Sequence, residues 1–95
     1  MSVFAVLLPT ENPKLTDIIK KKFPDPDHYQ ITSTQWLVSA KGTAKQVSDT
    51  LGVSAKEKED RMGSAVILAI SSYWGVASTE LWDWIKAKME ESLND

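Results

Sequence analysis

The sequence predicts an α+β domain in which helices pack against one four-stranded antiparallel sheet. Short apolar runs alternate with segments whose apolar residues recur at helical spacing, in the order strand, helix, strand, strand, helix, strand, helix. The 95 residues suit a single domain (1–95), and 42% hydrophobic with 25% charged residues is an ordinary globular composition. Because the sequence has no cysteine, it offers neither a disulfide nor a thiolate metal site.

The first strand is predicted over residues 3–8, where both faces are apolar. No basic region precedes this segment, so we expect a strand and not a signal peptide. Asn12 is a good N-cap and Pro13 suits the first position of a helix that runs to Phe23. The buried stripe of this helix is predicted to comprise Leu15, Ile18, Ile19 and Phe23.

Two strands and a second helix follow. Residues 28–32 are polar, as expected of a sheet edge, whereas residues 35–40 form a hydrophobic strand. Thr43 is the expected N-cap of the second helix, and Gly52 is its expected C-terminal stop. The predicted buried stripe of this helix comprises Ala44, Val47 and Leu51.

The last strand and helix follow a charged loop predicted over residues 53–62. The run at 64–71 is rich in Val, Ile and Leu, which predicts a central strand covered on both faces. The final helix is expected to be capped by Ser78 or Thr79. Its apolar stripe includes Leu81, Trp82, Ile85 and Met89, with Trp84 on the flank.

This element order is that of the ferredoxin-like plait, βαββαβ with an extra C-terminal helix, and predicts the strand order 4-1-3-2. Two helices cover only one face of such a sheet, yet strands one and four are apolar on both. Either the third helix or a second subunit is expected to cover the other face. The predicted interface residues are Trp36, Trp82, Trp84, Ile85 and Met89.

Five segments carry a resemblance that extends over nearly the whole chain: Trp36-Leu-Val-Ser-Ala, the stretch 42–52, Gly63-Ser-Ala-Val-Ile, Ile70-Ser-Ser-Tyr-Trp-Gly and Leu81-Trp-Asp-Trp-Ile-Lys. They resemble small bacterial proteins that carry the label "SinR family protein". This resemblance implies a bacterial or phage-related origin and no established activity.

By its plan alone, the chain is also similar to the Cas2 and VapD group of ferredoxin-like endoribonucleases, which are homodimers. The Cas2 pattern places a metal-binding Asp at the end of strand one, where this chain reads Leu8-Pro9-Thr10-Glu11. Glu11 is the only carboxylate there, and it is better explained as the neighbour of an N-cap. Metal-dependent cleavage is therefore disfavoured, and we predict no metal site, no catalytic residue and no cofactor.

Polar residues at one rim of the predicted sheet could bind an anion such as phosphate. They are Ser2, Ser39, Lys41, Gly42, Thr43, Ser71, Ser72 and Tyr73. The simpler interpretation is that these residues form turns and caps. Similarly, His28 is better explained as structural, and the Lys20–Lys22 run as the solvated end of a helix.

Two functions remain open from the sequence. The favoured one is a cytoplasmic homodimeric interaction module without catalytic activity, which could also bind another protein. The alternative is a Cas2- or VapD-like protein that binds nucleic acid or acts as a metal-dependent endoribonuclease. The net charge of −2 and the pI of about 5.3 argue against a large nucleic-acid surface, and no segment is long enough to span a membrane.

Overall fold

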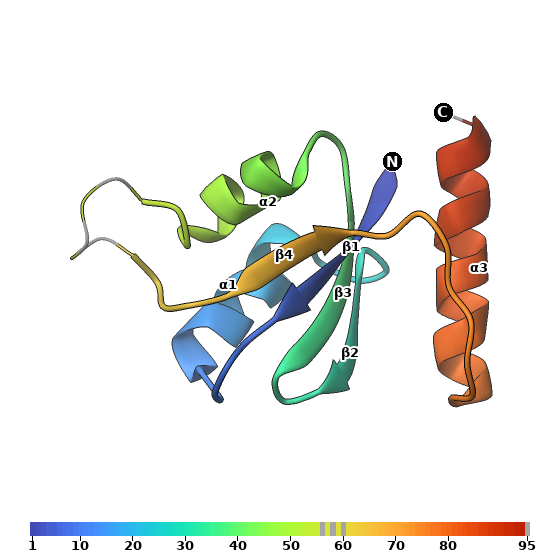
Figure 1. Cartoon of the computed structure of the whole chain (residues 1–95), viewed down its shortest axis with the longest axis horizontal. Coiled ribbons are helices and arrows are strands. Elements are labelled where there is room, and N and C mark those ends of the chain that lie inside the picture. Colours follow the sequence, from blue (N-terminus) through green and yellow to red (C-terminus); the bar gives the residue numbers. More distant parts are fainter. Residues whose placement is uncertain (56, 58, 60, 95) are drawn as a thin grey trace.

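The structure, a computed structural model, describes residues 1–55, 57, 59 and 61–94, and the side chains up to Glu91. Its elements follow the predicted order (Figure 1). The expected loop at 53–62 lies partly outside the described residues. In the described part, the elements are β1 (Ser2–Leu7), α1 (Pro13–Lys22), β2 (His28–Thr32), β3 (Gln35–Ala40), α2 (Ala44–Leu51), β4 (Val66–Ala69) and α3 (Thr79–Asn94).

The four strands form one antiparallel sheet in the order β2-β3-β1-β4, which is 4-1-3-2 when read from the β4 edge. Ser2 of β1 lies opposite Ala40 of β3, and Phe4 lies opposite Ala69 of β4. The start of β1 and the ends of β3 and β4 therefore share one rim of the sheet.

The helices α1 and α2 cover the first face of the sheet and enclose the larger core. Asn12 caps α1 as predicted, because its side chain accepts a hydrogen bond of 3.2 Å from the backbone N–H of Leu15. Gly52 ends α2 in the left-handed conformation at φ +78°, which glycine adopts without strain. The buried members of this core are Phe4, Val6, Leu8, Leu15, Ile19, Phe23, Trp36, Val38, Ala40, Val47 and Leu51.

The third helix, one of the two predicted covers, packs on the second face. Ser78 caps it, since its hydroxyl accepts a hydrogen bond from the N–H of Leu81. The smaller core on this face comprises Val3, Leu37, Leu81 and Ile85. Figure 1 shows α3 standing beside one end of the sheet, on the side away from α1. It therefore covers only part of the second face.

Two polar contacts hold α3 to the segment that precedes β2. The ammonium of Lys88, a buried side chain, lies 3.1 Å from the carboxylate of Asp27 and 3.5 Å from that of Glu91. The indole N–H of Trp84 donates a hydrogen bond of 2.8 Å to the carbonyl of Pro26. The position of α3 is thus fixed by specific groups in addition to its apolar stripe.

The prediction that the run at 64–71 is a central strand covered on both faces is wrong. The strand is shorter, Val66–Ala69, and pairs only with β1, which leaves it at an edge. Val66 and Leu68 are 55% and 49% exposed. The physical reason is that α3 packs over the opposite end of the sheet and does not reach these side chains.

Candidate functional site

The predicted interface residues are mostly used inside the chain. Trp36 is 1% exposed and belongs to the first core, so the prediction that it reaches a partner is wrong. It sits on a central strand, with the ring of His28 at 5.7 Å and the ammonium of Lys20 at 5.8 Å from its own ring. Ile85 is also buried, while the half-buried residues Trp82, Trp84 and Met89 pack against the second core.

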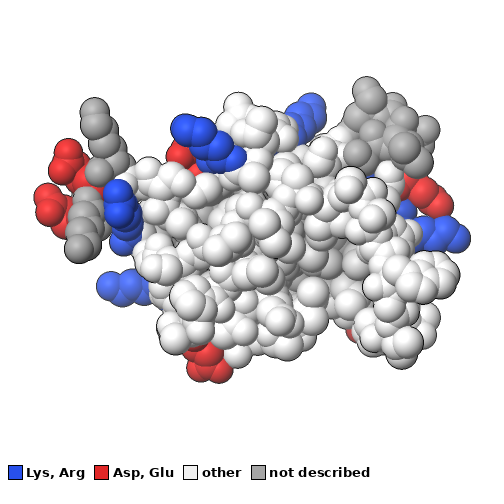
Figure 2. All heavy atoms as spheres, viewed as in Figure 1, with Lys and Arg blue, Asp and Glu red and all other residues white. Residues whose placement is uncertain are grey.

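The sheet instead exposes apolar side chains at the corner formed by β1 and β4. We call Leu7, Val66 and Leu68 the apolar corner. Leu7 lies directly opposite Val66, and Leu68 lies opposite Ala5, so the three side chains share the second face. Figure 2 shows that charged side chains gather toward the outline of this side of the molecule and leave the surface over β4 uncharged. Exposed apolar surface of this kind is typical of an interaction site.

The two edges of the sheet differ in how they are protected. β2 has a polar composition and an irregular register between Gln30 and Thr32. β4 has the sequence Val-Ile-Leu-Ala, with no charge, no proline and no register shift against β1. Charges, prolines and bulges are the usual means by which an edge strand avoids pairing with another chain. β4 has none of them and is therefore open to such pairing.

The alternation of side chains could have revealed this corner from the sequence. Val66 and Leu68 are two residues apart, so in a strand they must face the same side. The predicted strand order already placed this strand at an edge. What the sequence does not contain is the position of α3, which decides whether the corner is covered.

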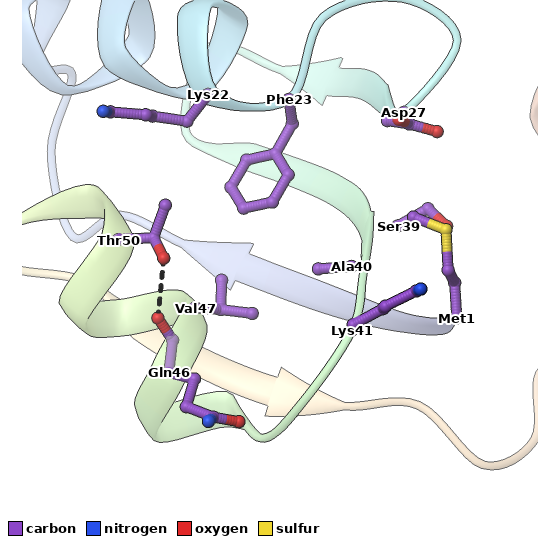
Figure 3. A pocket seen from close by; sticks show the side chains of 10 residues that line it. All are labelled: Met1, Lys22, Phe23, Asp27, Ser39, Ala40, Lys41, Gln46, Val47 and Thr50. Carbon is purple, nitrogen blue, oxygen red and sulfur yellow. Dashed lines mark hydrogen bonds between the residues drawn. The ribbon is translucent and has the colours of Figure 1, made fainter.

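A pocket of about 260 Å³ lies at the rim where the anion site was predicted (Figure 3). Phe23, Ala40 and Val47 contribute apolar side chains to it, and Lys22 and Lys41 lie on opposite sides of it with their ammonium groups directed away from its centre. Ser39 also lines the pocket. Its hydroxyl is buried without a hydrogen-bond partner among the described residues. Of the predicted rim residues, only Ser39 and Lys41 meet here.

The other predicted rim residues do not join this pocket. Two amides at the start of α2 are occupied, because the hydroxyl of Thr43 accepts from the N–H of Gln46 and the Gln46 side chain accepts from the N–H of Thr43. Gly42 and Ser2 line a second pocket with Lys41 and Met1. Ser71 and Ser72 are exposed beyond β4 and line none of these pockets. The structure thus supports the cap interpretation of Thr43.

Tyr73 belongs to a different site, an aromatic pocket of about 320 Å³ between the segment 70–78 and α3. Its ring stacks on that of Trp82, with 5.8 Å between the centroids and 28° between the planes. Trp74 is 99% exposed. The lining residues of the aromatic pocket are Tyr73, Trp74, Gly75, Trp82 and Lys86.

The remaining candidate residues have structural surroundings. The Nδ1 atom of His28 lies 2.6 Å from the carbonyl oxygen of Phe23, and its Nε2 atom lies 3.6 Å from the carboxylate of Asp25. Glu11 is exposed beside the N-cap Asn12. Among the described residues, His, Asp and Glu side chains form no group of three that could hold a metal ion. Within the same residues, no helix has the length and apolar character needed to cross a membrane.

Comparison of the chain with protein-family models, curated proteins and solved structures finds no match. The resemblances to the proteins labelled SinR and to the Cas2 and VapD group therefore stay predictions.

Proposed function

We propose that the chain is a homodimeric interaction module, built on a ferredoxin-like plait, in which β4 and the apolar corner form the contact. The observation that carries this proposal is the combination of an uncharged, unprotected edge strand with exposed Leu7, Val66 and Leu68 beside it. The edge supplies unpaired main-chain groups, and the corner supplies apolar area that association removes from water.

A second copy of this chain suits the surface because the strand is complementary to itself. When two β4 strands pair antiparallel with Ile67 on the two-fold axis, Val66 lies opposite Leu68 of the partner subunit. Both side chains are on the second face, so the apolar pair repeats on either side of the axis. Leu7 neighbours Val66 in the register and extends the contact. This is the self-matching geometry that a two-fold dimer requires.

The charge distribution also favours self-association. Two copies carry equal net charges of −2, so a dimer contact must lie where these charges do not oppose each other. The surface over β4 meets this condition, because in Figure 2 the charged side chains lie toward the outline of the molecule and not over β4. Pairing there brings together apolar groups without removing a charge from water.

Leu68→Glu tests the proposal, with Ile31→Glu as the matched control. Both leucine-sized side chains are about equally exposed, at 49% and 42%, but Ile31 lies on β2 at the opposite edge. In the dimer, Leu68→Glu places one carboxylate from each subunit in the apolar contact. The two carboxylates lie close to each other and repel. We expect sedimentation equilibrium to show a dissociation constant at least about 100-fold weaker than for the unaltered chain.

The control is expected to keep the dissociation constant of the unaltered chain within about threefold. Circular dichroism would show that both variants remain folded. A monomeric unaltered chain, or an equal loss of association in the two variants, would contradict the proposed contact.

A further inference from the structure

The aromatic pocket is on α3 and the segment before it, apart from the β4 contact. We propose that it binds a small planar aromatic molecule that carries a negative charge, such as a nucleotide or an aromatic carboxylate. The first observation is that the exposed indole of Trp74 lines this pocket together with the stacked rings of Tyr73 and Trp82, so that three aromatic side chains are grouped at one place on the surface. This inference does not depend on the dimer.

The walls of the aromatic pocket suit a flat ring. Tyr73 and Trp82 are stacked on each other, which holds the Trp82 indole as a fixed surface. Trp74 lines the same pocket and is almost fully exposed, so its indole surface is available to a ligand. Gly75, which follows Trp74 and also lines the pocket, has φ +148°, a conformation that favours glycine, and a Cβ there would lie 4.0 Å from the Trp82 ring.

The charge of the ligand follows from Lys86. It lines the aromatic pocket four residues after Trp82, so the two side chains project from the same face of α3. Among the described residues, no carboxylate forms an ion pair with its ammonium. A cationic ligand would be repelled at this position, whereas an anionic substituent on a stacked ring would be attracted. Aromatic stacking and one positive charge together define the ligand class.

The four tryptophan indoles permit a direct test by NMR, because each gives its own N–H signal. The probes are adenosine monophosphate and naphthalene-2-carboxylate, with adenosine and inorganic phosphate as probes that lack the charge or the ring. We expect the charged aromatic probes to shift the signals of Trp74 and Trp82. Trp36 is buried and Trp84 is hydrogen-bonded to Pro26, so their signals serve as internal controls and should not move.

Two variants connect these shifts to the aromatic pocket. Trp74→Ala removes one stacking wall and is expected to weaken binding at least about fivefold. Lys86→Gln is expected to weaken binding of the charged probes about threefold, and to leave the weak binding of adenosine unchanged. The matched control is Lys14→Gln, an exposed lysine on α1 that should have no effect.

The outcomes separate the two sources of the ligand. A response to adenosine monophosphate alone supports a nucleotide, a response to naphthalene-2-carboxylate alone supports an aromatic carboxylate, and either supports the pocket. The proposal is overturned if neither probe shifts Trp74 and Trp82 at about 10 mM, or if adenosine binds as tightly as its monophosphate. The same titration of the Leu68→Glu variant, in which the proposed dimer contact is weakened, should give the same shifts. This keeps the result independent of the dimer.

Discussion

Trp36→Ala is expected to lower the free energy of unfolding by about 3–5 kcal/mol, as for other fully buried aromatic residues. The side chain is 1% exposed and packs in the first core beneath α1. Truncation would leave a cavity between α1 and the sheet, because the rigid strand β3 cannot move into the space. Urea unfolding at one fixed protein concentration measures the loss.

Two further tryptophan variants test whether the loss of stability is specific to the buried indole of Trp36. The indole N–H of Trp36 has no hydrogen-bond partner among the described residues, so Trp36→Phe removes no bond and should lower stability by no more than about 1.5 kcal/mol. Trp74→Ala should change it by less than about 0.5 kcal/mol, because that side chain is fully in water. Equal losses for Trp36→Ala and Trp74→Ala would contradict the assigned core.

Asp27→Asn is expected to lower the free energy of unfolding by about 1–3 kcal/mol, since it removes the nearest counter-charge of the buried Lys88. The lower part of this range reflects the partial exposure of Asp27, at 35%, and the contact that Lys88 keeps with Glu91. Loss of the ion pair should also loosen α3, which would appear as faster amide exchange in that helix.

The double change Asp27→Asn with Lys88→Met provides the control. Methionine keeps the apolar stem of the lysine and brings no charge, so the double variant should recover most of the stability that Asp27→Asn loses. If the double variant is less stable than Asp27→Asn by a further 1 kcal/mol or so, then Lys88 contributes in another way and the ion pair is not what anchors α3.

Local sequence signals predicted much of the fold. Asn12 with Pro13, and Thr43 with Gly52, marked the ends of α1 and α2 because capping depends on side chains within a few residues. The stripe of Leu15, Ile19 and Phe23 indicated the buried face of α1 for the same reason. The element order then restricted the ways in which four strands can be arranged in one sheet.

The candidate sites depended on longer-range packing, which local signals do not determine. Trp36 and Trp74 are both aromatic residues next to apolar ones, yet one is buried in the core and the other is in water. The covered residue Leu37 lies on a central strand beneath α3, whereas the exposed residue Leu68 lies on an edge strand that α3 does not cover. The predicted anion rim does not form one site, because the cap hydrogen bonds of Thr43 lie within α2 and Tyr73 stacks on Trp82 in a different pocket.

The most direct measurement of the proposed dimer is a disulfide cross-link through Ile67→Cys. The chain has no other cysteine, and antiparallel pairing about Ile67 brings the two introduced thiols to opposing positions within disulfide range. We predict a covalent dimer under mild oxidation, and none for Ala69→Cys, whose two copies lie on either side of the axis. Failure of Ile67→Cys to cross-link, or equal cross-linking of Ala69→Cys, would contradict pairing through β4.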